Sequence, residues 1–237
     1  MPVSSAAADP YATTDTGEPQ PDSIPAEYKA LTVTLLALLA AYLAPKPGMP
    51  WPSWVQGALA GMPRFRTAVI AEVNRLAARL EPLIEHAVAE VVAAAGREAA
   101  HDARWSGTLP GVPHGTVESL LDALRAAHPR IVAVLEDTYR SAVQRAATAV
   151  GDPTVAIQRT LDDLAARGIT GYTDRAGRRW NLETYVETVV RSHYAQAALD
   201  TYLQTVGRAG VRFLAVSENK STHIECRSWE GKNLSID

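Results

Sequence analysis

The sequence predicts a mainly α-helical fold, in which long, kinked helices are followed by a small α+β module towards the C-terminal end. The 237-residue chain is rich in alanine, and only 6% of its residues are aromatic, a composition that favours helices. Apolar residues also recur at spacings of three and four over long stretches, which is the period of a helix with one buried face.

The bulk composition limits the function classes. The chain carries 23 Lys and Arg residues against 26 Asp and Glu residues, a net charge of −3, so no overall basic field marks it as a nucleic-acid binder. Its length is sufficient for a real hydrophobic core. The single cysteine, Cys226, excludes an internal disulfide and is typical of a reducing compartment.

Residues 1–25 predict an extended or disordered arm, because Pro, Ser, Thr, Asp and Gly dominate there. The arm lacks the basic and apolar regions of a signal peptide. The next region, residues 26–62, contains the apolar run Ala30–Ala44. This run is shorter than the roughly 20 residues that cross a bilayer. We interpret it as a buried or partner-facing helix, with a membrane span and an interfacial helix as the alternatives.

The apolar run is also the candidate docking element. Both of its faces are apolar, so it must be covered on several sides. The following linker, Pro45–Trp54, holds prolines at four of its positions and is expected to be a rigid, extended connector. We interpret the two tryptophans of the linker as packing anchors. The candidate docking residues are Leu31, Leu35, Leu38, Tyr42, Trp51 and Trp54.

Residues 63–166 predict a long helical hairpin. The first helix is expected over Arg64–Arg104, with a kink or a break into two abutting helices at Pro82. The second helix is expected over Thr116–Val150, with a kink at Pro129. The expected buried stripe of the first helix is Phe65, Val69, Val73, Leu76, Leu80, Leu83, Ala87 and Val91. Two such amphipathic helices favour antiparallel packing, and they need further partners to cover their stripes.

A third helix is expected to restart at Gly151-Asp152-Pro153. Asp152 is a good N-cap, and proline is favoured at the first helical position. Gly168 is placed to end this helix in the left-handed conformation.

Residues 167–237 form the expected C-terminal module. A hairpin is predicted over Ile169–Trp180, with a type I turn at Asp174–Gly177. Asn181 is expected to cap a helix over Leu182–Val206. The apolar segment Val211–Ser217 is then typical of a strand.

This module resembles the phage minor capsid proteins, the head-morphogenesis group with Mu F-like and SPP1-type minor head proteins. The matching features are Gly168-Ile169-Thr170-Gly171, Asp174-x-x-Gly177-Arg178-Arg179-Trp180, the helix start Leu182–Arg191, Val216-Ser217 and Cys226-x-x-Trp229-x-Gly231-Lys232. The resemblance covers residues 167–237, and the helical N-terminal part fits the usual layout of the family without diagnostic residues.

The resemblance implies a structural minor capsid protein of a tailed bacteriophage rather than an enzyme. Such a protein is expected to dock on the portal protein, the major capsid protein or both, in several copies per particle and without a membrane. It would assemble in the host cytoplasm and reside in the virion, in the capsid interior or at the portal vertex. One alternative is the N-terminal carrier region of a longer phage-derived protein with a C-terminal toxin or enzyme domain.

Three arginines in the predicted hairpin, Arg175, Arg178 and Arg179, are candidate contacts with the backbone of packaged double-stranded DNA. A solvated or salt-bridged turn is the competing interpretation. A free-standing DNA-binding protein that uses these arginines is the second alternative function.

The candidate metal ligands are His223 and Cys226. Relatives often have Cys-x-x-Cys before the Trp-x-Gly-Lys segment and a further His/Cys cluster downstream, and here that second half is missing. A structural zinc site needs four ligands, so we expect no cofactor and keep zinc as the alternative. The missing half also predicts that these residues are the retained part of a longer product. No sequence motif of a known active site is present.

Overall fold

The computed structural model describes residues 23–46, 48–150, 152–173, 179–216 and 227–236. The chain divides into two compact units. The first, which we call the bundle unit, comprises Pro21–His86 and Gly115–His193. The second, the C-terminal unit, comprises the described residues of Ala87–His114 and Tyr194–Asp237. Most of the described residues are helical, as predicted.

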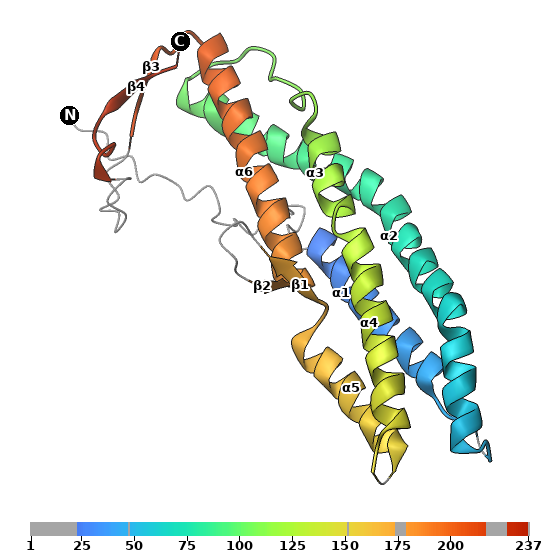
Figure 1. The fold of residues 1–237 in the computed structure, drawn as a ribbon. Coiled ribbons are helices and arrows are strands. Elements are labelled where there is room, and N and C mark those ends of the chain that lie inside the picture. The colour runs from blue at the N-terminus through green and yellow to red at the C-terminus, as the bar shows by residue number, and fades with distance from the viewer. Residues whose placement is uncertain (1–22, 47, 151, 174–178, 217–226, 237) are drawn as a thin grey trace. The chain divides into compact units, whose positions relative to one another are not determined.

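The helices of the bundle unit pack side by side (Figure 1). They are α1 (Ser23–Leu43), the first part of α2 (Trp51–Asp102), α3 (Thr116–Arg125), α4 (His128–Ala147), α5 (Pro153–Arg167) and the first part of α6 (Leu182–Arg208). The hydroxyl of Tyr139 in α4 donates to the carbonyl of Ala58 at 2.8 Å, while Glu136 pairs with Arg66 further along α2. These contacts run in opposite order along the two helices, so the predicted antiparallel hairpin is confirmed.

Three aromatic rings form the centre of the bundle. Phe65 is fully buried in α2, and its ring stacks on Tyr139 of α4 with the centroids 4.7 Å apart. Tyr42 of α1 meets the same phenyl ring edge-on at 5.5 Å. One phenylalanine therefore joins three helices through apolar contact.

The proline-rich linker is shorter than predicted. Trp51 and Trp54 belong to α2, so the connector ends at Pro50. It also does not run extended as predicted, because the Met49 N–H donates to the Lys46 carbonyl at 3.1 Å and closes a turn. Pro52 lies in the first turn of α2, where a missing N–H removes no intrahelical hydrogen bond. The helix also continues through Pro63 and Pro82, so the alternative of two abutting helices is wrong.

Beyond Leu80 the buried stripe of α2 also differs from the prediction. Ala87 is buried as predicted, but Ile84, Val88 and Val92 are buried in place of Leu83 and Val91, which are only half-buried. From Leu80 to Val92 the large buried side chains follow one row in steps of four residues. Such a row is inclined to the helix axis, so it departs from a stripe drawn parallel to the axis.

The predicted helix Thr116–Val150 is two helices. The first, α3, ends at Arg125, and α4 begins at His128 after a turn at Ala126 and Ala127. Pro129 lies in the first turn of α4, so it starts a helix where we expected it to kink one.

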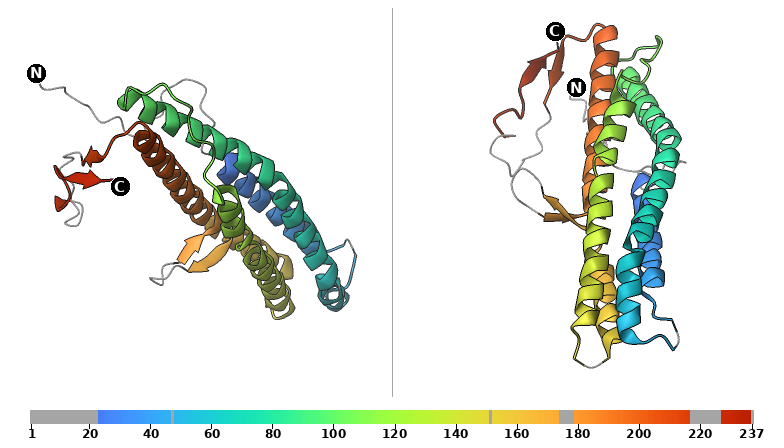
Figure 2. Two further views of the ribbon diagram at one scale, coloured as in Figure 1. Left: turned by 90° about the horizontal axis from the view of Figure 1, so that it is seen from above. Right: turned by 45° about the vertical axis from the view of Figure 1, so that its right-hand side comes forward.

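Helix α5 lies against α4 in the views of Figures 1 and 2. A short hairpin follows it in the chain. The Asp152 side chain accepts a hydrogen bond from the Thr154 N–H at 2.9 Å, which confirms the predicted N-cap. Gly168 ends the helix with φ 66° and ψ −173°. Its φ is positive as predicted, but its ψ lies outside the left-handed helical region.

The hairpin pairs β1 (Thr170–Thr173) antiparallel with β2 (Arg179–Asn181), as predicted, and the predicted type I turn at Asp174–Gly177 lies outside the described residues. The Asn181 side chain accepts from the Thr184 N–H at 2.8 Å, which confirms the cap of α6. The Ile169 carbonyl accepts from the Leu182 N–H at 2.8 Å and so ties the end of α5 to the start of α6.

The C-terminal unit joins the end of α2 to the end of α6. The Tyr202 hydroxyl donates to Asp102 at 2.9 Å, and burial together with this carboxylate raises the pKa of Tyr202 to about 12. After α6, strand β3 (Phe213–Ala215) pairs antiparallel with β4 (Asn233–Ser235). The first strand falls within the predicted segment, whereas β4 was not predicted.

Candidate docking surface

Helix α1 has one face in the bundle and one face exposed. Its buried residues are Ile24, Tyr28, Leu31, Leu35, Leu39 and Leu43. The exposed face, which we call the α1 outer face, consists of Ala30, Val33, Thr34, Ala37 and Ala41. Val33 is 64% exposed, and no charged residue occurs from Ala30 to Pro45. The Thr34 hydroxyl donates to the Ala30 carbonyl at 3.0 Å, so this face offers little polar surface.

A groove lies beside the α1 outer face, between α1 and α5. Its volume is about 170 Å³. We call it the α1–α5 groove, and it is lined by Lys29, Thr32, Val33, Leu35, Leu36, Leu135, Leu164, Ala165, Ile169 and Glu183. Most of the lining is apolar, while Lys29 and Glu183 contribute one charge of each sign.

Polar contacts near its N-terminal end help to fix α1 in the bundle. The Tyr28 ring is fully buried, and its hydroxyl lies 3.0 Å from Nε2 of His128, the first residue of α4. Glu27 of α1 pairs with Arg79 of α2 at 2.8 Å. The part-buried hydrogen bond contributes more to the position of α1 than the exposed ion pair does.

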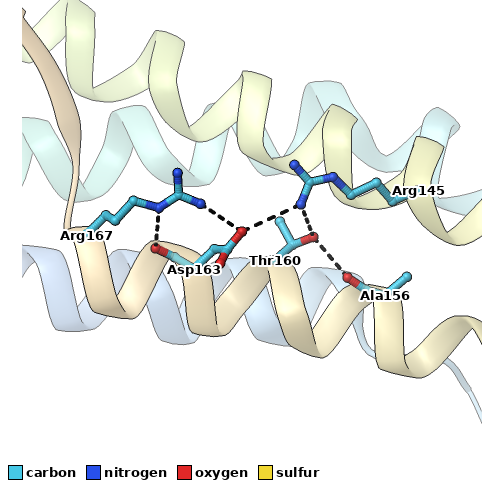
Figure 3. A network of polar contacts seen from close by, with 5 residues as sticks. All are labelled: Arg145, Ala156, Thr160, Asp163 and Arg167. Atoms are coloured by element: carbon cyan, nitrogen blue, oxygen red, sulfur yellow. Dashed lines mark hydrogen bonds and ion pairs between the residues drawn. The ribbon is translucent and has the colours of Figure 1, made fainter.

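A polar network holds α5, the other wall of the groove, against α4 (Figure 3). Asp163 pairs with Arg167 at 2.7 Å and with Arg145 of α4 at 3.8 Å. Arg145 also donates to the Thr160 hydroxyl at 3.4 Å, and this hydroxyl donates to the Ala156 carbonyl. The arginines are more than half exposed, so the network sets the position of α5 and adds little stability.

The environment of His128, the partner of Tyr28, makes the stability of the bundle depend on pH. Burial, followed by the positive charge of Arg125, lowers the pKa of His128 below its ordinary value of 6.5. As the pH falls below 6.5, the unfolded chain takes up this proton before the folded chain does. The stability that His128 contributes is therefore full above pH 6.5 and is lost as the pH falls towards the lowered pKa.

We expect the free energy of unfolding to fall more between pH 7.5 and pH 5 in the parent protein than in a His128→Gln variant. Urea titrations followed by circular dichroism measure both profiles. Since the two proteins differ at this residue alone, the difference between the profiles isolates His128. Parallel profiles would contradict the prediction.

The sequence-predicted docking residues make contacts within the chain. Leu31, Leu35 and Trp54 are buried, and Leu38, Tyr42 and Trp51 are half-buried. Trp51 stacks on Trp54 with the ring centroids 4.4 Å apart, and its indole N–H donates to the Ala146 carbonyl at 3.2 Å. Whether any of the six contacts a partner stays a prediction. Sequence reasoning named none of the exposed residues, although the apolar character of both faces of the run pointed to them.

The other candidate residues lie largely outside the described part of the chain. This holds for Arg175 and Arg178, and for His223 and Cys226. Arg179 lies in β2, and its side chain is outside the description. The described residues contain no group of three or more His, Cys, Asp or Glu side chains that would hold a metal ion.

Helix α1 is longer than the apolar run from which it was predicted, with 21 residues. By length and mean hydropathy (1.4 in its most apolar window) it meets the criterion for a membrane span, which the core helices of soluble proteins also meet. Its buried face, packed on the bundle, supports the interpretation as a bundle helix.

The described residues thus form packing surfaces, with an uncovered apolar helix face as the most distinctive of them. Such surfaces are suited to packing against other protein subunits. The chain matches the family model of phage minor capsid protein 2 over residues 15–237, and it therefore belongs to this family. The searches of curated proteins and of solved structures gave no match.

The family match confirms the resemblance drawn from residues 167–237 and extends it over nearly the whole chain. The family is structural, which gives the protein a place in the phage virion and an interaction with other components of the phage head.

Proposed function

We propose that this minor capsid protein docks on the portal protein, the major capsid protein or both inside the phage head, through the α1 outer face. The observation that carries the proposal is the exposure of an uncharged face on a helix whose other face is fully buried, with Val33 64% exposed. A partner surface that covers this face removes apolar area from water, which favours association.

The α1–α5 groove supports the same proposal. An apolar side chain of a partner fits its floor, which includes Leu36, Leu135 and Leu164. Lys29 and Glu183 at the same groove supply opposite charges that would select the orientation of the partner.

A double variant, Val33→Glu with Ala37→Glu, tests the α1 outer face. Two carboxylates would be buried without partners in the docked state, so we expect the number of copies per particle to fall about tenfold or more. Quantitative mass spectrometry of purified particles, relative to the major capsid protein, measures this number. The matched control is Ala78→Glu with Ala133→Glu, two exposed alanines of α2 and α4 that receive the same charge.

Equal incorporation of the two double variants would remove the α1 outer face from the proposal. Pull-down of the purified chain with purified portal protein and, separately, with major capsid protein identifies the partner. Binding to neither protein would overturn docking on both.

A further inference from the structure

The β3–β4 hairpin has one strand edge whose backbone groups bond to no described residue. Its register pairs Phe213 with Ser235, Leu214 with Leu234 and Ala215 with Asn233. Two further bonds, from the Val216 N–H to the Lys232 carbonyl (2.8 Å) and from the Ile236 N–H to the Arg212 carbonyl (3.1 Å), show which pairs are hydrogen-bonded. Hydrogen-bonded and non-hydrogen-bonded pairs alternate along an antiparallel ladder. The hydrogen-bonded pairs are therefore those of residues 212, 214 and 216 with their partners in β4 or next to it.

It follows that the N–H and C=O groups of Phe213 and Ala215 point away from β4. Neither residue's backbone bonds elsewhere in the described part of the chain. The outer edge of β3 therefore presents two donors and two acceptors at the spacing that an added strand requires.

The side chains of the hairpin are also uncovered. Phe213 is 64% exposed on one face of the ribbon, and Leu234, which pairs with Leu214 on the other face, is 39% exposed. The main contacts of the two described strands are with each other. A two-stranded ribbon of this kind is marginally stable in water, and a third strand stabilises it.

We propose that the β3 edge pairs antiparallel with the β3 edge of a second copy of this chain, with Leu214 opposite Leu214 of the second copy. In this register Phe213 faces Ala215 of the second copy, and the open N–H and C=O groups of both residues are bonded. The product is a four-stranded sheet with β4 strands outside and a two-fold axis between the two leucines. Such a contact is closed, since each copy uses the same edge.

The side chains of β3 fit a second copy at every position of this register. A large side chain, Phe213, lies opposite a small one, Ala215, and the two leucines extend the apolar pair with Leu234 into a stripe across the sheet. Arg212 lies opposite Val216 of the second copy, so no like charges face each other. If the register shifted by two residues, only one of Phe213 and Ala215 would be opposite a residue of the second copy whose N–H and C=O groups are also unpaired. This self-complementarity favours a second copy over a strand of another protein.

A cysteine placed at the two-fold axis tests the register in the purified full-length chain. The background variant Cys226→Ser removes the single native cysteine. In it, Leu214→Cys places two thiols on directly opposite residues of adjacent strands, within reach of a disulfide. With oxidised glutathione as the oxidant, we expect a covalent dimer on a non-reducing gel.

The matched control is Leu234→Cys, on the same face of the same hairpin. In the proposed sheet the two Leu234 positions are three strand spacings apart, about 14 Å, which a disulfide does not span. We expect a yield of covalent dimer about tenfold lower for Leu234→Cys than for Leu214→Cys.

A second variant separates the edge contact from the fold of the hairpin. Ala215→Pro removes an N–H group that β4 does not use, so the hairpin keeps its own bonds while the edge loses a donor. Added to Leu214→Cys, it should lower the cross-linked fraction about tenfold at unchanged helical circular dichroism. Equal cross-linking at positions 214 and 234, no cross-linking at 214, or insensitivity to Ala215→Pro would each overturn the proposal. The test uses the chain alone, so it is independent of docking on the portal or major capsid protein.

Discussion

Replacing Phe65 with alanine is expected to lower the free energy of unfolding by about 3–5 kcal/mol. The phenyl ring is fully buried and is in contact with Tyr139 of α4 and Tyr42 of α1. Its removal leaves a cavity where three helices meet. The hydroxyls of the two neighbouring rings, Tyr139 and Tyr42, donate to the carbonyls of Ala58 and Arg64. These bonds hold the rings in place, so they cannot fill the cavity without movement of the helices that carry them.

Urea denaturation followed by circular dichroism measures the effect of Phe65→Ala. The control is Leu59→Ala in the same helix, where the leucine is half exposed and the expected loss is about 0.5 kcal/mol. If the two variants lost similar stability, the aromatic contact would not be the centre of the bundle.

The same residues show what the sequence could predict. Phe65, Val69, Val73, Leu76 and Leu80 follow the helical period, and all five are buried as predicted. Periodicity succeeds here because burial of an apolar stripe is what stabilises an amphipathic helix. The caps at Asp152 and Asn181 were equally predictable, because each bond is made to a neighbour along the chain.

The prolines show where local reasoning fails. Pro52 and Pro129 lie in first turns, whereas Pro63 and Pro82 lie inside a helix. All four have the same local effect on the backbone, namely a fixed φ and a missing N–H. Tertiary packing decides whether a helix continues through the proline or begins at it, and a single sequence does not contain that information.

The second hairpin and the α1 outer face were missed for a related reason. Strand β4 has three residues, too few for an alternating pattern, and its pairing with Phe213–Ala215 joins residues distant in the chain. For α1, the composition showed that both faces are apolar. Which face is buried is decided by contacts such as that of Tyr28 with His128, about a hundred residues away.

Replacing Gly168 with alanine is expected to lower the free energy of unfolding by about 1–3 kcal/mol. The backbone of Gly168, at φ 66° and ψ −173°, lies in a region that residues with a Cβ essentially never adopt. Space is not the obstacle, because among the described residues an added Cβ would meet only the Cβ of Asn181, at 3.9 Å. The loss is therefore one of backbone strain alone.

This strain falls on the link between α5 and α6. The Gly168 N–H donates to the Leu164 carbonyl at 2.8 Å, and the next residue, Ile169, is buried and bonded to the first residue of α6. Gly57→Ala in α2 is the matched control. It has ordinary helical φ and no neighbour within 4 Å of the added Cβ, so alanine should stabilise the helix by about 0.5–1 kcal/mol. We expect the urea midpoint to shift in opposite directions for the two variants. That result would show that the stability loss in Gly168→Ala comes from the positive φ at the link between α5 and the hairpin, and not from the replacement of a glycine as such. Shifts of the same sign would contradict this role.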